Sequence, residues 1–135
     1  MTNVKTHLMF QGNAEDAIGL YSSVFGDFAV KSVERYGDGE GMDAGAFKRA
    51  QVLFAGHVLQ IFDSPPIHDF GFTPSISLFV DFDTRHEFDA AFERLSDGGT
   101  VMMPPDDFGF SARFAWVEDR FGVSWQLNLQ PPEVT

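Results

Sequence analysis

Residues 122–127 read GVSWQL, and residues 56–61 read GHVLQI. Both stretches contain a glycine followed four positions later by a glutamine, and apolar residues flank each glutamine. Alternation of apolar and polar side chains is typical of a β-strand with one buried face. Because the same strand pattern recurs about half a chain length later, we expect the chain to consist of two similar halves.

Each half also contains one helix signature. In residues 12–27, GNAEDAIGLYSSVFGD, Asn13 is the expected N-cap and Gly26 the expected end of the helix. In residues 83–99, DTRHEFDAAFERLSDGG, Thr84 begins a capping box. The apolar residues at helical spacing are Ala17, Ile18, Tyr21, Val24 and Phe25 in the first helix and Phe88, Ala91, Phe92 and Leu95 in the second.

Four strands are expected in each half. They are residues 6–11, 29–36, 47–55 and 57–63 in the first half, and 74–81, 100–103, 111–117 and 123–129 in the second. Residues 104–107 are expected to form a surface loop. The order βαβββ therefore occurs twice in an α+β fold, which predicts a single domain over residues 1–135 with modules at about 4–63 and 74–129 and a linker at 64–73.

Composition excludes several classes of function. The chain carries 20 acidic and 9 basic side chains, a net charge of −11, so neither nucleic acid nor an anionic membrane is expected as a partner. The absence of cysteine excludes a disulfide scaffold, a thiolate zinc site and a cysteine nucleophile. Since no apolar run has the length of a signal peptide or a membrane span, a cytoplasmic protein is expected.

Three segments carry a family resemblance. They are residues 12–27, the segment FDSPPIHDFGFTPSISLFVDFD at 62–83, and the closing WVEDRFGVSWQLNL at 116–129. Together they resemble the PhnB-like branch of the vicinal oxygen chelate superfamily, which includes glyoxalase I, extradiol dioxygenases and fosfomycin and bleomycin resistance proteins. Some members are labelled demethylubiquinone methyltransferases. The chain shows no glycine-rich strand–turn–helix for a nucleotide-like cofactor, so methyltransferase activity is not expected.

The resemblance implies where a metal ion would be held. Enzymes of the superfamily hold one divalent metal with His and Glu side chains from four strands. Those positions fall on Ser75, Gln126 and Gln60, and near Thr6 or His7 at the first strand. Amides and a hydroxyl are weak ligands, so we expect no strong metal site and no cofactor, with His7, Gln60 and Gln126 as the weak metal candidates.

The same positions are candidates for contact with a small molecule. His7, Gln60 and Gln126 have the opposite parity to their apolar neighbours and should face the pocket of the fold. His7 could instead be a hydrogen-bonded residue at a strand end, the two glutamines could bond one another, and His68 could be a linker residue paired with Asp69. The full set of candidate pocket residues is His7, Gln60, Phe62, His68, Ser75, Ser77, Phe79, Ser124 and Gln126.

These observations predict a PhnB-like protein that binds a small polar or aromatic molecule in a cup-shaped pocket without a strong metal site. Two alternatives remain open: a metal-dependent lyase, isomerase or dioxygenase of glyoxalase type, and a drug-sequestering resistance protein. No catalytic residue can be named from the sequence. The resemblance also implies a homodimer.

Overall fold

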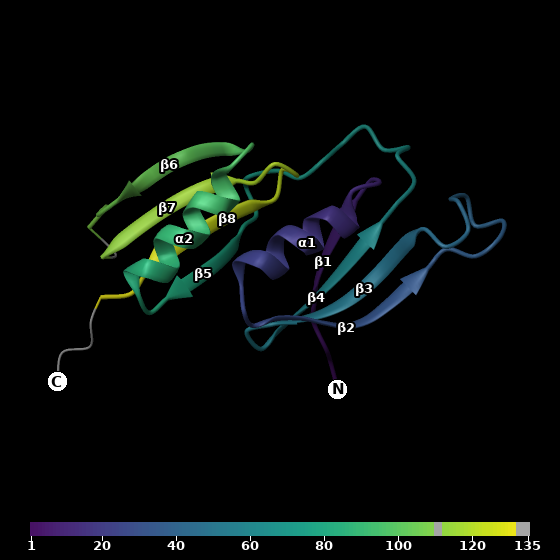
Figure 1. The fold of residues 1–135 in the computed structure, drawn as a ribbon, viewed down its shortest axis with the longest axis horizontal. Helices are drawn as coiled ribbons and strands as arrows, with labels where there is room; N and C mark the ends of the chain where they lie inside the picture. The colour runs from purple at the N-terminus through teal and green to yellow at the C-terminus, as the bar shows by residue number, and fades with distance from the viewer. Residues whose placement is uncertain (110–111, 132–135) are drawn as a thin grey trace. The chain divides into compact units, whose positions relative to one another are not determined.

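The computed structural model describes residues 1–109 and 112–131 of the 135-residue chain. The chain divides into two compact units, Met1–Phe70 and Gly71–Thr135. Each unit contains one four-stranded sheet and one helix, in the order strand, helix, three strands (Figure 1). This repeat confirms the α+β fold of two βαβββ modules that the sequence predicts.

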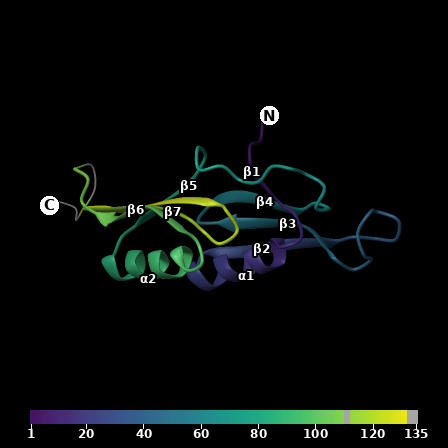
Figure 2. The same cartoon turned by 90° about the horizontal axis from the view of Figure 1, so that it is seen from above.

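The first unit contains the sheet β1-β4-β3-β2, in which β1 runs parallel to β4 and the other neighbours are antiparallel. Its elements are β1 (Thr6–Phe10), α1 (Ala14–Val24), β2 (Phe28–Arg35), β3 (Phe47–Phe54) and β4 (His57–Asp63). Helix α1 lies along one face of this sheet (Figure 2). The other face carries no helix of the unit, and we call it the first open face.

Burial divides the strands of the first unit between the two faces. Strand β4 buries Leu59, Ile61 and Asp63 toward α1, while Gln60 and Phe62 point to the first open face. Helix α1 buries Ala14, Ala17, Leu20 and Tyr21. Of the predicted apolar stripe, Ala17 and Tyr21 are buried, Ile18 and Val24 are half-buried, and Phe25 is buried just beyond the last helical residue, Val24.

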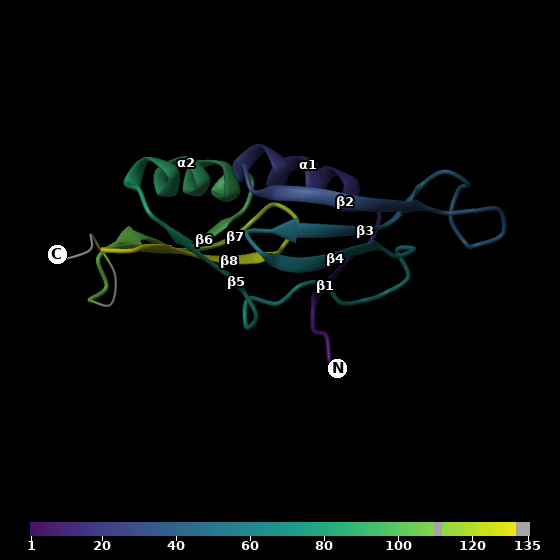
Figure 3. The same ribbon diagram turned by 90° about the horizontal axis from the view of Figure 1, so that it is seen from below.

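The second unit repeats this arrangement with the sheet β5-β8-β7-β6. Its elements are β5 (Leu78–Phe82), α2 (Arg85–Ser96), β6 (Thr100–Asp106), β7 (Arg113–Glu118) and β8 (Ser124–Leu129). Helix α2 lies along one face (Figure 3) and buries Phe88, Ala91 and Leu95. The face away from α2, toward which Gln126 and Asn128 point, is called the second open face.

Two strand predictions for the second unit were wrong, and one lies partly outside the described residues. Residues 74–77 precede β5 rather than belong to it, because Pro74 and Ser75 form a turn. Strand β6 continues through Pro104-Pro105, which were expected in a loop. Strand β6 lies at the sheet edge and its pairing with β7 is irregular between Met103 and Asp106, two settings in which a strand tolerates proline. The strand expected at 111–117 begins at Ser111, outside the described residues.

The two helices are capped differently. Thr84 Oγ1 accepts a hydrogen bond from Glu87 N at 3.2 Å, as predicted. Asn13 makes no side-chain cap bond, which corrects the expectation for α1. The buried carboxylate of Asp63 accepts from Gly12 N at 2.6 Å and from the backbone of Asn13 and Ala14. A residue at the end of β4 therefore caps α1.

Among the helices of the described residues, none has the length and apolar character needed to span a membrane.

Candidate functional site

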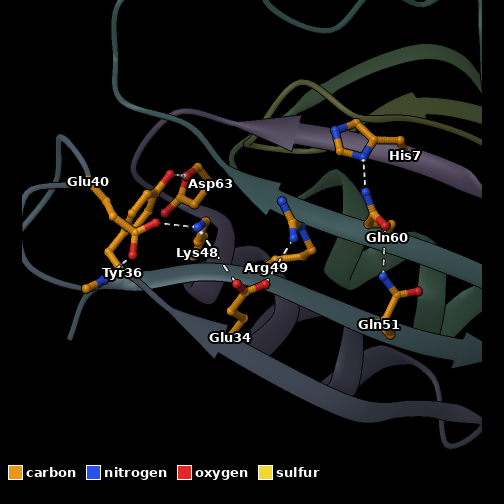
Figure 4. Close-up of polar contacts among 10 residues, drawn as sticks. His7, Glu34, Tyr36, Glu40, Lys48, Arg49, Gln51, Gln60 and Asp63 are labelled. Carbon is orange, nitrogen blue, oxygen red and sulfur yellow. Dashed lines mark hydrogen bonds and ion pairs between the residues drawn. The ribbon is translucent and has the colours of Figure 1, made fainter. Parts of the chain in front are cut away.

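The first open face carries a row of three hydrogen-bonded side chains. His7 on β1, Gln60 on β4 and Gln51 on β3 are paired across the sheet. Gln51 Nε2 donates to Gln60 Oε1 at 2.9 Å, and Gln60 Nε2 lies 2.8 Å from His7 Nδ1 (Figure 4). Both polar atoms of Gln60 are thus used within the row, which we call the His7–Gln60–Gln51 row.

A second group on the same face surrounds the ring of Phe62. The guanidinium carbon of Arg49 lies 5.5 Å from the centre of that ring, and the His7 ring centre lies 6.0 Å away. Arg49 also pairs with Glu34, at 3.0 Å between Nη1 and Oε2. The Nε atom of Arg49 is buried without a partner in the part of the chain that the structure describes. This face therefore offers an aromatic ring between an imidazole and a paired guanidinium.

The second open face has the corresponding row, with different residues. Phe79 on β5, Gln126 on β8 and Trp116 on β7 are paired in the same register as His7, Gln60 and Gln51. Gln126 Nε2 donates to Ser77 Oγ at 3.2 Å. The Ser77 and Ser124 hydroxyls are 2.6 Å apart, and Trp116 Nε1 donates to Ser124 Oγ at 2.9 Å. The hydroxyls thus link the glutamine of the row to its tryptophan.

Aromatic side chains dominate the rest of the second open face. The Phe79 side chain is 55% exposed, and its ring centre lies 6.3 Å from that of Phe114. Phe114 is packed edge-on against Phe108 at 5.9 Å. Farther along the sheet, Asn128 Nδ2 donates to Asp81 Oδ1 at 2.8 Å. This face can therefore offer an aromatic surface to a ligand, with amide and hydroxyl groups beside it.

Most of the predicted site residues lie on the two open faces, and two do not. Ser75 lies in the turn before β5, where its hydroxyl is 3.2 Å from that of Thr73. His68 lies in the exposed segment after β4, with its ring centre 5.0 Å from that of Phe70. Gln11 holds this segment by accepting from His68 N at 3.0 Å and donating to Phe70 O at 3.0 Å.

The sequence analysis missed three residues of the open faces: Gln51, Arg49 and Trp116. Each lies on the third strand of its unit, and each points to the open face because it pairs with an open-face residue of the fourth strand. Strict alternation in residues 47–55 would have placed Arg49 and Gln51 on one face. Alternation alone does not show which face this is, because that depends on the register between β3 and β4.

The residues at the family's metal positions do not fit a divalent ion. Gln60 directs its amide nitrogen, which has no lone pair to offer, at His7, and its carbonyl oxygen is occupied by Gln51. Gln126 supplies only a neutral amide, and Ser75, which supplies only a hydroxyl, lies in the turn before β5. Over residues 1–109 and 112–131, no group of three or more His, Cys, Asp or Glu side chains could hold a metal.

A charged cluster lies at the other end of the first sheet. Lys48 Nζ pairs with Glu40 Oε2 at 2.6 Å, which raises the pKa of Lys48 and lowers that of Glu40. Burial raises the pKa of Tyr36, whose hydroxyl donates to Asp63 O at 2.5 Å (Figure 4). Burial also raises the pKa of Asp63 despite its backbone hydrogen bonds. These contacts hold the loop after β2 against the end of β4.

Comparisons with known proteins agree with this architecture. The PhnB protein from Bacillus cereus is 37% identical, covers 95% of this chain and 99% of its own, and superposes with a TM-score of 0.88. Protein YjdN of Escherichia coli is 27% identical over 96% of each chain. A glyoxylase/bleomycin resistance protein/dioxygenase domain from Frankia, 16% identical over 97% of this chain and 99% of its own with a TM-score of 0.62, shares the fold.

The pattern of the 3-demethylubiquinone-9 3-methyltransferase family matches residues 2–128, nearly the whole chain. The chain therefore belongs to that PhnB-like family.

Proposed function

We propose that this protein binds a small polar or aromatic molecule on the open faces of its sheets, without a strong metal site. The observation that carries the proposal is the His7–Gln60–Gln51 row. Both polar atoms of Gln60 are engaged by Gln51 and His7 at a position where superfamily enzymes place a metal-binding carboxylate. An amide row of this kind suits hydrogen bonding to a ligand better than coordination of an ion.

Each open face, taken by itself, offers both polar and aromatic groups to a ligand. His7 is exposed at the end of its row, and the ring of Phe79 is exposed at the corresponding position of the second sheet. When a ligand covers apolar surface of this kind, the complex is stabilised by roughly 25 cal/mol per Å² of buried area. Sites for small molecules typically combine such apolar walls with a few placed polar groups.

Elemental analysis of the protein purified without chelators tests the metal-free part of the proposal. We expect far less than one metal ion per chain. One tightly held zinc, nickel, iron or manganese ion per chain would contradict it and favour the metal-dependent lyase, isomerase or dioxygenase.

A thermal-shift screen of metabolites and antibiotics tests the binding part, because a ligand of the folded state raises its stability, by about 2.7 kcal/mol at 100 times Kd. We expect hits whose stabilisation persists in EDTA and is reduced by His7→Ala or Phe79→Ala. The matched control is His86→Ala on the exposed first turn of α2, which should leave the shift unchanged. Stabilisation that EDTA abolishes would overturn the proposal. Tight binding confined to an antibiotic, without turnover, would identify the drug-sequestering alternative.

The dimer that the resemblance implies and the cytoplasmic location both stay predictions. Sedimentation equilibrium of the full chain tests the first, with a mass of twice 15.0 kDa expected. Fractionation of cells that produce the protein tests the second.

A further inference from the structure

We infer that Gln51 sets the tautomer of His7 through Gln60, so that the first open face presents His7 Nε2–H as a donor to an acceptor atom of the ligand. The ligand part of this inference rests on the proposed function. The tautomer part rests on the hydrogen bonds of the row alone, and it can be tested without a ligand. Gln51 is a positioning residue in this scheme, since it acts on the ligand only through two other side chains.

The direction of the hydrogen bonds determines the tautomer. The nitrogen of a glutamine side chain has hydrogens to donate and no lone pair to accept with. Gln60 Nε2 is the atom that lies 2.8 Å from His7 Nδ1, so Nδ1 must be the acceptor. A neutral imidazole carries one N–H, and here it must therefore be on Nε2.

Gln51 determines which way Gln60 points. Its Nε2 donates to Gln60 Oε1 at 2.9 Å, which leaves Gln60 Nε2 directed at His7. A reversed Gln60 would bring its own nitrogen against the nitrogen of Gln51, two donors without an acceptor between them. The cost of such a mismatch in a half-buried pair exceeds the net value of an ordinary hydrogen bond. Gln60 therefore cannot reverse by itself, and in the structure the row runs from Gln51 to His7.

The donor at the end of the row is available to a ligand. His7 is exposed, and its Nε2 atom has no hydrogen-bond partner within residues 1–109 and 112–131. Arg49 and Glu34, which lie on neighbouring strands of this sheet, are paired with each other. The ligand atom that His7 recognises is thus an acceptor, such as a carboxylate, carbonyl or phenolate oxygen.

Nitrogen-15 NMR of the histidine ring in the intact protein tests the tautomer. His7→Ala identifies the signal by its loss, and spectra at about pH 9 report the neutral ring. We expect the Nε2–H form in the wild type. In Gln51→Glu, residue 51 can only accept, so Gln60 reverses, offers its carbonyl oxygen to Nδ1, and the ring changes to the Nδ1–H form. A wild-type spectrum for Gln51→Glu would overturn the inference.

Two further variants separate hydrogen bonding from charge and from loss of fold. Gln51→Met removes the donor at similar length without adding charge, and we expect a larger Nδ1–H population than in the wild type. Leu53→Glu adds the same charge to the exposed open-face side of β3 outside the row, and we expect the wild-type tautomer. An inverted tautomer in Leu53→Glu, or no change in Gln51→Met, would contradict a role for the row.

The ligand class is tested with two planar probes of matched shape, benzoate, which only accepts, and benzamidinium, which only donates. We measure both affinities at the His7 ring signal. The affinity for benzoate divided by the affinity for benzamidinium should be about tenfold lower in Gln51→Glu than in Leu53→Glu. An unchanged ratio with an inverted tautomer would remove the ligand part of the inference. If neither probe perturbs His7 while the screen finds ligands on the second open face, the ligand part also fails and the proposed function stands.

Discussion

The two units share one architecture and use opposite chemistry at the same positions. The row His7, Gln60, Gln51 of the first sheet corresponds by register to Phe79, Gln126, Trp116 of the second. Only the central glutamine is common to both. The flanking positions are hydrogen-bonding in the first unit and aromatic in the second. The fold therefore depends on the pairing of the strands, while the side chains of the open faces can vary with function.

The units also solve the same structural tasks with different residues. The N-terminus of α1 is capped from β4 by Asp63, whereas Thr84 caps α2 locally. The turn between β3 and β4 uses two left-handed residues, Ala55 and Gly56. The turn between β7 and β8 is held by Asp119, which accepts from Phe121 N, Val123 N and Trp125 Nε1. We therefore expect matched substitutions in the two units to change the free energy of unfolding by different amounts.

The largest difference is expected at the glycines that follow the two helices. A Cβ on Gly99 would lie 2.1 Å from Glu118 O, so Gly99→Ala forces the backbone of β7 to move. We expect a loss of about 3 kcal/mol in the free energy of unfolding, measured by urea denaturation. Gly26→Ala meets no atom within 4 Å and should cost at most about 0.5 kcal/mol. Equal costs at the two sites would break the comparison.

The caps are expected to give the next largest effect. Asp63→Ala leaves three N–H groups at the start of α1 without their acceptor, and Asp63 is 5% exposed, so we expect a loss of about 2–3 kcal/mol. Asn13→Ala should cost at most a few tenths, roughly, because Asn13 makes no side-chain cap bond. Thr84→Ala should cost about 1 kcal/mol. A loss of about 1 kcal/mol or more for Asn13→Ala would contradict capping by Asp63.

The buried carboxyl of Asp63 also predicts a pH dependence that Thr84 cannot give. Burial raises the pKa of Asp63 in the folded state, so the folded chain keeps this proton when the unfolded chain has lost it. Stability should therefore fall as pH rises from about 4 to the raised pKa, and by at most about 1.4 kcal/mol per pH unit. The difference in unfolding free energy between wild type and Asp63→Asn isolates this contribution. A difference that grows with pH would mean that the backbone hydrogen bonds outweigh burial.

The smallest effect on stability is expected from exchanging the flanking residues of the two rows. His7→Phe and Phe79→His replace exposed side chains, so each should change the free energy of unfolding by less than about 1 kcal/mol. Both should reduce the thermal shift produced by hits of the ligand screen. If His7→Phe destabilises the protein as much as Asp63→Ala does, the row supports the fold rather than a ligand.

Local pattern was sufficient for most of the fold. Strand β4 was predicted at residues 57–63 as found, and the role of Thr84 as the N-cap of α2 was confirmed. The prediction errors arose where the neighbours of an element in the folded structure decide its bounds or its capping residue. Pro104-Pro105 belong to strand β6, which lies at a sheet edge. Asn13 does not cap α1 because Asp63, which is distant in sequence, accepts the hydrogen bonds instead.

The candidate site was predicted in part for the same reason. Parity placed His7, Gln60, Phe62 and Gln126 on the open faces, because a strand's side chains alternate with a period of two. Gln51, Arg49 and Trp116 were missed, since their contribution depends on which residues of β4 and β8 lie opposite them. Ser75, placed by resemblance, lies before the strand in which it was expected.

The sequence by itself determined the duplication, the two helices and the family, because each of these depends on residue type and local spacing. Only the tertiary structure decided that Gln60 joins His7 to Gln51 and that Asp63 caps α1. Hydrogen bonds act over about 3 Å, so they depend on register and strand order, which bring together residues that lie far apart along the chain.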